Sequence, residues 1–287
     1  MRLGGTGIWS AGLRFGEASA VAEASAELEE LGYSALWIPD IGGEVFPSLG
    51  TMLEATSTIV AATGILNIWM HTPGETAAGF ADLSGEHPDR VLLGLGVSHA
   101  ALIDASDPGR YQQPLRVMRE YLDALDTATP PVPRDARVLA ALGSRMLELA
   151  RDRSAGAHPY LVTPEHTAIA REALGADSLL APEQAVVLET DATRARQLAR
   201  GHLSIYLTLP NYTNNLRRLG FTDADIGDGG SDRLVDAIVA WGDEGAAQRR
   251  VQQHRDAGAD HVAVQVITDD FSALPLAEWR RLAAALI

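Results

Sequence analysis

Polar side chains recur where the apolar runs of this 287-residue chain end. One run stops at Asp40, followed by Ile-Gly-Gly, and another carries Asn67 and then His71. A third, rich in glycine, is followed by Ser98 and His99. Carboxylate and amide groups at strand ends can hold a polar ligand, and histidine titrates near neutral pH. These residues therefore predict a site built from strand ends, with His71 and His99 as candidate proton donors.

Two later runs end immediately before helical patterns. Gly143 and Ser144 open one of these patterns, and Thr163 opens the other, with His166 three positions further on. The N-terminus of a helix offers unpaired N–H groups and a positive dipole end. We therefore expect the phosphate of a cofactor between these two helix starts, with Arg145 or His166 adding positive charge.

The predicted site has aromatic residues and few carboxylates. That composition suits a flat conjugated ligand better than a sugar or a metal ion. No metal site is predicted, because the candidate ligands Asp40, His71, His99 and Glu165 are scattered along the chain. The sequence also lacks cysteine and lysine, which excludes thiolate chemistry, disulfides, Schiff bases and the phosphate-binding P-loop lysine.

Charge and hydropathy narrow the class of protein further. The formal net charge is −15, with no basic stretch that would bind nucleic acid. No apolar run approaches the roughly 18 residues that a membrane span needs. The first residues lack the apolar core of a signal peptide. We expect a cytoplasmic protein that acts on a small-molecule substrate, without nucleic acid or membrane partners.

Apolar runs alternate with amphipathic stretches from end to end. Alternation of this kind indicates parallel strands buried on both faces and connected by helices. The strand-like runs cover residues 5–10, 33–39, 64–70, 90–97, 137–142, 157–162, 184–189 and 261–267. The pattern predicts one α/β domain over residues 1–287, a (β/α)₈ TIM barrel. A doubly wound sheet is less consistent, because Gly94 and Gly96 are followed by His99 where a phosphate fingerprint needs a third glycine.

One connection is too long for a simple barrel unit. Residues 207–242 follow the seventh predicted strand and contain short helical pieces, a Gly-Gly pair and several aromatic residues. Long insertions in compact domains tend to be functional. We expect this segment to be a lid-like insertion on the active-site side, with Tyr206, Asn211 and Tyr212 facing the substrate.

Several segments together resemble the luciferase-like monooxygenase superfamily, whose members are flavin- or deazaflavin-dependent TIM barrels. They are "LGYSALWIPD", "GILNIWM", "LSGEHPDRVLLGLGVSHA" and "GDEGAAQRRVQQHRDAGADHVAVQ". The phrase "LTLPNYTNNLRRLGF" resembles the actinobacterial branch that uses the deazaflavin coenzyme F420. The resemblance covers nearly the whole chain and implies a homodimer.

The resemblance also implies roles for individual residues. Asp40 corresponds to an acidic residue beside the deazaflavin ring, although Ile41 stands where relatives often have histidine. Asn67 and Ile68 correspond to a strand-three bulge with a non-proline cis peptide that backs the ring. The cofactor-binding set expected on these grounds is Asp40, Asn67, Ile68, Trp69, Gly96, Ser98, Gly143, Ser144, Thr163 and His166.

The leading functional hypothesis is an F420-dependent oxidoreductase that transfers a hydride between the deazaflavin and a small organic substrate. An FMN-dependent monooxygenase that works with a separate flavin reductase is the alternative, because the two cofactors share ring shape and phosphate. F420 adds an anionic glutamyl tail, which a protein of net charge −15 would bind only through a local arginine cluster. A non-catalytic barrel subunit and a metal-dependent hydrolase are further hypotheses.

Overall fold

The computed structural model describes residues 3–287. The strands are β1 (Gly5–Trp9), β2 (Ala35–Ile38), β3 (Val60–Thr63), β4 (Leu66–Asn67), β5 (Val91–Gly96), β6 (Arg137–Leu139), β7 (Gly156–Ala157), β8 (Leu179–Leu180), β9 (Glu183–Val187), β10 (Ala240–Trp241) and β11 (His261–Val266). The helices are α1 (Gly12–Phe15), α2 (Ala18–Glu30), α3 (Val45–Glu54), α4 (Pro73–Glu86), α5 (Ala100–Ser106), α6 (Pro114–Thr127), α7 (Ser144–Arg153), α8 (Pro164–Leu174), α9 (Ala192–Tyr206), α10 (Pro210–Arg218), α11 (Asp223–Ile226), α12 (Asp232–Ile238), α13 (Glu244–Asp256) and α14 (Leu276–Leu286), with a 3₁₀ turn at Arg134–Ala136.

The strands form one curled sheet in which every pairing is parallel. Its order is β10-β9-β11-β1-β2-β3-β5-β6-β7-β8. Only Ala181 and Pro182 separate β8 from β9, so one continuous segment pairs with β7 on one side and β11 on the other. Ala181 N donates to Ala157 O, and Ala263 N donates to Pro182 O. This continuity closes the path, which confirms the predicted barrel class.

The barrel interior is filled by side chains of unequal size. Trp37 is fully buried there and packs with Ala35, Ala62 and Ala263 from its own and other strands. Small residues opposite a tryptophan let the inward layers interdigitate at the density of a protein core. The inward side chains therefore pack as a core, and the cavity described below lies at one end of the barrel.

Two predicted strands differ from the observed ones. The third barrel strand is β3, which starts earlier than residues 64–70, and only β4 falls within that range. Residues 157–162 were predicted as a strand, but β7 ends at Ala157. Pro159 has no N–H to give to a sheet, and Leu161 has a positive φ of 58°. The chain after β7 therefore leaves the sheet and turns towards the cavity.

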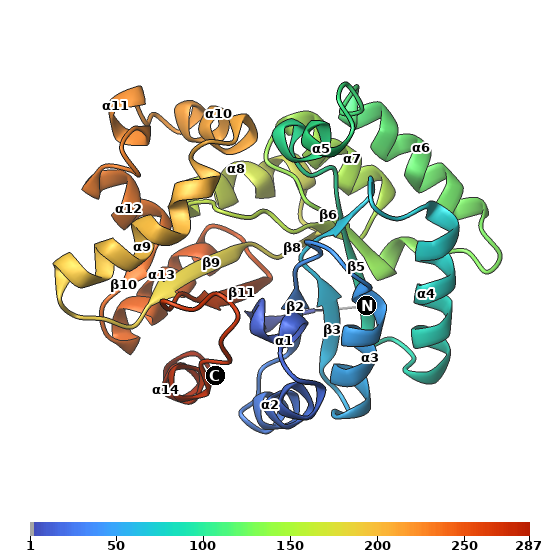
Figure 1. Cartoon of the computed structure of the whole chain (residues 1–287), viewed down its shortest axis with the longest axis horizontal. Coiled ribbons are helices and arrows are strands. Elements are labelled where there is room, and N and C mark those ends of the chain that lie inside the picture. The colour runs from blue at the N-terminus through green and yellow to red at the C-terminus, as the bar shows by residue number, and fades with distance from the viewer. Residues whose placement is uncertain (1–2) are drawn as a thin grey trace.

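The helices around the barrel are not evenly distributed. Figure 1 shows α9 to α12 grouped on one side of the molecule, away from α2, α3 and α4. Residues 207–242 form α10, α11, α12 and the edge strand β10, which pairs with β9. The strand β10 was not predicted. Helices α9 and α10 of this group supply part of one wall of the cavity described next.

Candidate active site

A cavity of about 1010 Å³ lies beyond the carboxyl ends of the strands. Its lining comes from the ends of β1, β2, β4, β5 and β11, from the loops after β6 and β7, and from α9 and α10. Barrel enzymes place their chemistry at this end, because the loops there can vary without disturbing the sheet. The cavity is large enough for a cofactor ring and a second small molecule.

One side of the cavity, here called the strand wall, is organised around Asp40. Its side chain is fully buried, and Oδ2 accepts hydrogen bonds from Asn67 N at 2.9 Å and from His71 Nε2 at 2.9 Å. The other oxygen, Oδ1, is buried and has no partner among the described residues. Asp40 and Asn67 both line the cavity. Oδ1 is therefore an unsatisfied acceptor just beneath the cavity surface.

His71 lies behind this carboxylate and not on the cavity surface. The hydrogen bond that His71 donates to Asp40 raises the pKa of His71, with burial opposing it. The imidazole N–H at this place hydrogen-bonds the Asp40 carboxyl group and fixes its orientation. The structure thus places His71 as a support for Asp40, whereas the sequence suggested that it meets the substrate directly.

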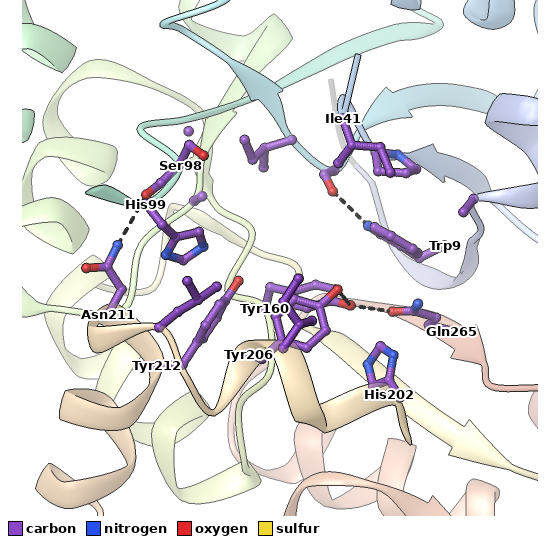
Figure 2. A pocket seen from close by; sticks show the side chains of 18 of the residues that line it. Trp9, Ile41, Ser98, His99, Tyr160, His202, Tyr206, Asn211, Tyr212 and Gln265 are labelled. Atoms are coloured by element: carbon purple, nitrogen blue, oxygen red, sulfur yellow. Dashed lines mark hydrogen bonds between the residues drawn. The ribbon is translucent and has the colours of Figure 1, made fainter. Parts of the chain in front are cut away.

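The segment after β3 turns sharply at the cavity surface. The non-proline cis peptide joins Gly64 and Ile65. The family resemblance had implied a cis peptide at Asn67 and Ile68. A Cβ on Gly64 would lie 2.5 Å from Trp9 Nε1, so only glycine fits there. The indole N–H of Trp9 donates to Gly64 O at 2.9 Å, as Figure 2 shows. Gly64 and Ile65 both line the cavity, although neither was predicted as a site residue.

Residues 67–69 of this segment stabilise the turn. Asn67 Oδ1 accepts from Trp69 N at 3.1 Å, which satisfies the buried amide locally. Trp69 Nε1 donates to Val97 O, and Ile68 N donates to Gly96 O. Neither Ile68 nor Trp69 borders the cavity. They hold the turn against the end of β5.

The residues after β5 do reach the cavity. Gly96, Ser98 and His99 all line it. Ser98 has a positive φ of 54°, and its carbonyl accepts from Asn211 Nδ2 of α10 at 3.2 Å. Burial lowers the pKa of His99 to about 4, and its Nδ1 is buried without a partner among the described residues. His99 is therefore a neutral imidazole at pH 7 with one hydrogen-bonding position unused.

Of the two predicted phosphate positions, only the first is open. Gly143 lines the cavity, and it also borders a second groove together with Ser144. Thr163 is buried and caps α8 by accepting from His166 N, while His166 Nε2 bonds to Leu142 O at 3.0 Å. Neither Thr163 nor His166 borders the cavity.

The opposite side of the cavity, here called the tyrosine wall, consists of Tyr160, Tyr206 and Tyr212. Their ring centroids lie 5.4 to 6.2 Å apart. Tyr160 OH donates to Gln265 Oε1 at 2.8 Å and lies 3.1 Å from Tyr206 OH. Figure 2 shows this wall below Trp9, whose ring centroid lies 5.5 Å from that of Tyr160. Tyr206 and Tyr212 were expected here, and they line the cavity as does Asn211.

Three residues of this side were missed in the sequence. Tyr160, His202 and Gln265 line the cavity, but Tyr160 stood inside a predicted strand and His202 inside an ordinary helix pattern. Gln265 interrupts an apolar strand, and that polar residue near a strand end was a usable signal. His202 gave none, because its exposure to the cavity follows from how α9 packs over the barrel.

Residues 3–287 contain neither a metal-binding cluster nor a membrane-spanning helix. No cluster of three or more histidine, cysteine, aspartate or glutamate side chains is arranged to hold a metal ion. None of the helices combines the length and apolar character needed to cross a membrane.

Comparison with known proteins identifies the family. The family model described as luciferase-like monooxygenase matches residues 6–261. The chain belongs to the luciferase-like monooxygenase family. A comparison with curated proteins finds no match.

Solved structures of this family type share the fold over nearly the whole chain. An F420-dependent secondary alcohol dehydrogenase, in complex with an F420-acetone adduct, superposes with a TM-score of 0.76 at 14% identity, covering 99% of this chain and 98% of that one. A coenzyme F420-dependent tetrahydromethanopterin reductase from Methanopyrus kandleri gives 0.73 at 15%, covering 100% and 99%.

An FMN-containing neighbour has a similar score. The oxygenating constituent of 3,6-diketocamphane monooxygenase from Pseudomonas putida, a type II Baeyer-Villiger monooxygenase in complex with FMN, gives a TM-score of 0.70 at 13% identity, covering 99% of this chain and 97% of that one. At these identities the likeness establishes the fold of this luciferase-like chain. The choice between a deazaflavin and a flavin has to come from its own residues.

Proposed function

We propose that this protein is an F420-dependent oxidoreductase that transfers a hydride between the deazaflavin and a small organic substrate. The observation that carries this proposal is a groove of arginines that adjoins the cavity. Four guanidinium groups line it, contributed by α6, α7 and α10: Arg116, Arg119, Arg145 and Arg218. Gly143 and Met146 border both the groove and the cavity, so a molecule in one can extend into the other.

The groove is locally basic, although the protein as a whole is acidic. The chain carries a formal charge of −15, and most of its arginines pair with carboxylates, as Arg116 does with Glu120 at 2.6 Å. Arg145, in contrast, has no hydrogen bond or ion pair among the described residues and is exposed. Guanidinium groups bind phosphate and carboxylate groups in matched geometry. The groove therefore suits a long anionic tail, which F420 has and FMN lacks.

The strand wall suits the ring of such a cofactor. Asp40 offers an unpartnered oxygen for a ring N–H, and the backbone at Gly64 and Gly96 allows close approach of a flat group. A Cβ on Gly96 would lie 2.5 Å from Ile65 Cδ1, so a side chain there would push Ile65 into the cavity. A bound deazaflavin would supply the hydride chemistry, and the protein would supply position and electrostatics.

The chain's own groups define how a substrate proton is handled. His99 lines the cavity, and its lowered pKa of about 4 keeps it neutral at pH 7. A neutral imidazole can orient a substrate hydroxyl or carbonyl through Nδ1. It can also accept a proton transiently during the reaction. His71 keeps Asp40 in place through Nε2. We assign His99 the contact with substrate and His71 a positioning role.

A second candidate is an FMN-dependent monooxygenase with a separate reductase. The observation in its favour is the open N-terminus of α7 at Gly143, which can receive a phosphate without any tail. In that case the arginines further along the groove would contribute little to affinity.

Titration of the purified protein with F420 and with FMN separates the two. We expect F420 to bind at least about tenfold tighter, with an affinity that falls steeply as salt rises. Arg145→Gln and Arg119→Gln should each weaken F420 about threefold to tenfold and leave FMN nearly unchanged. Arg151→Gln on the same helix is the matched control, since Arg151 pairs with Asp152 outside the groove. Tight binding of FMN alone would favour the second candidate, and binding of neither would refute both.

Family resemblance adds two proposals that concern the context of the enzyme. We propose that it acts as a homodimer in the cytoplasm. Sedimentation of the purified protein tests the first point, and fractionation of the producing cells tests the second.

A further inference from the structure

The tyrosine wall continues at both ends into an imidazole. His99 packs on Tyr212 with ring centroids 5.0 Å apart, and His202 packs on Tyr206 at 5.1 Å. Figure 2 shows the two histidines at opposite ends of the tyrosine row. The result is a continuous row of aromatic rings, tilted by 41° to 89° to their neighbours, and a planar apolar molecule can meet their edges and faces.

The two ends carry unused hydrogen-bonding positions. His99 Nδ1 and His202 Nε2 are buried and have no partner among the described residues. Burial lowers the pKa of each ring to about 4, so both are neutral at pH 7. A buried polar atom without a partner is unfavourable, and a ligand hydroxyl or carbonyl can supply the missing hydrogen bond.

No charged side chain of this surface lines the cavity, and the carboxyl group of Glu183 behind it has a pKa that burial raises to about 8. The acidic and basic residues that line the cavity lie elsewhere: Asp40, Arg194, Arg218, Asp269 and Asp270. Arg194 pairs with Asp269, and both are well exposed. Arg218 also borders the arginine groove, and Asp40 belongs to the strand wall. A charged substrate against the tyrosine wall would lose hydration without gaining a counter-ion.

The entrance is apolar as well. Ile41, Leu102, Ile205 and Phe271 are large hydrophobic residues that are about half or more exposed, and all four border the cavity. Exposed apolar side chains gathered in one place mark a binding surface more often than single scattered ones do. An apolar molecule would therefore meet a favourable surface from the mouth to the tyrosine wall.

We propose that the substrate of this site is an uncharged, largely apolar molecule with a planar ring system that bears hydroxyl or carbonyl groups. Its ring system lies along the tyrosine wall, and its oxygen atoms meet the imidazoles of His99 and His202. This inference rests on the proposed function, since it gives the substrate class for the reaction assigned to the same cavity.

Binding of two matched probes tests the proposal. 2-Naphthol and 2-naphthoate share a ring system, and at pH 7 the first is neutral and the second anionic. Calorimetric titration is carried out on the protein saturated with F420, or with FMN if only that binds. We expect 2-naphthol to bind at least about tenfold tighter. Equal or tighter binding of 2-naphthoate, or binding of neither probe, would overturn the proposal.

Two variants locate the interaction. His202→Phe keeps an aromatic ring and removes the free nitrogen, so 2-naphthol should bind about three- to tenfold more weakly. Leu198→Arg, one helical turn before His202 and also in the lining, should shift the preference towards 2-naphthoate. His87→Gln is the control, because His87 follows α4 at the other end of the barrel and lies outside the cavity. A preference unchanged by both lining variants would place the probe elsewhere and refute the assignment.

The test separates this inference from the proposed function. If neither cofactor binds, the oxidoreductase proposal fails, and the naphthol titration on the protein alone still decides the substrate class. If a cofactor binds and 2-naphthoate is preferred, the oxidoreductase proposal stands and the inference about the substrate is wrong.

Discussion

The two walls of the cavity are built on different principles. The strand wall is a hydrogen-bond network in which Asp40 Oδ2 serves both Asn67 N and His71 Nε2, while Oδ1 has no partner among the described residues. The tyrosine wall is mainly a set of ring contacts, with unpaired ring nitrogens at His99 and His202. Directional hydrogen bonds fix one geometry, whereas ring contacts tolerate different partners. This difference suits a wall that holds a constant cofactor and a wall that selects a variable substrate.

The largest expected effect concerns Glu183, which lies behind the tyrosine wall and accepts from Leu161 N at 3.2 Å. Burial raises its pKa from 4.5 to about 8. The folded protein then keeps a proton that the unfolded chain has lost, so stability falls as pH rises from about 5 to about 8, by up to about 1.4 kcal/mol per pH unit. Glu183→Gln should remove this slope and be more stable than the parent above pH 8.

Urea unfolding at pH 5, 6.5 and 8 measures the slope. Glu189→Gln provides the control, since Glu189 follows the same strand but keeps partial contact with solvent. Parallel pH profiles for the parent protein and Glu183→Gln would show that the carboxyl is ionised in the folded state, contrary to the expectation.

The second prediction compares the walls directly. Asp40→Ala leaves Asn67 N and the His71 imidazole without their acceptor, and we expect it to lower the free energy of unfolding by about 3 kcal/mol. Tyr206→Phe removes a hydroxyl at 3.1 Å from Tyr160 OH and should cost less than about 1 kcal/mol, because Tyr160 keeps Gln265 as an acceptor. Urea midpoints for the two variants give the comparison. Similar losses would mean that both walls are equally rigid.

The third prediction uses acid to separate the walls. The pKa of His202 is lowered to about 4, so its contribution to stability is lost as pH falls from 6.5 towards 4. The pKa of His71 is raised, so its contribution is present below 6.5 and lost as pH rises through the folded pKa. At pH 5, His202→Gln should therefore gain about 2 kcal/mol relative to its effect at pH 8, and the effect of His71→Gln should shift in the opposite direction. Thermal unfolding at both pH values checks the signs, and shifts of the same sign would contradict the assignment.

The strand wall was more accessible from the sequence than the tyrosine wall. Asp40, Asn67, Gly96, Ser98 and Gly143 follow or end apolar runs, and parallel strands bring their carboxyl ends to one edge of a barrel. That reasoning recovers the barrel and places these residues on one cavity. The same reasoning does not locate the cis peptide. It lies at Gly64–Ile65, and no side-chain pattern in the sequence marks that position.

The tyrosine wall depends on tertiary packing that a pattern does not encode. The insertion was recognised by its length, Tyr212 by its place within it, and Tyr206 by its position immediately before it. Tyr160 enters the cavity because the chain leaves the sheet at Pro159, and His202 because α9 turns that face inward. Thr163 and His166 illustrate the reverse error: a helix start with a good cap was taken for a phosphate site, but the cap uses the hydroxyl and burial closes the rest.

The smallest effect is expected at the mouth, where neither wall controls binding. Arg194 and Asp269 form an exposed ion pair there, and such pairs contribute less than about 1 kcal/mol to stability. Asp269→Asn should leave the urea midpoint nearly unchanged and free the Arg194 guanidinium. The freed charge should raise the association rate of F420 about twofold at low salt, and this gain should vanish near 0.5 M salt because the charges are then screened. Stopped-flow fluorescence measures the rate, and 2-naphthol, which is uncharged, should bind at the parent rate. A salt-independent gain would mean that the substitution changes the shape of the mouth and not its field.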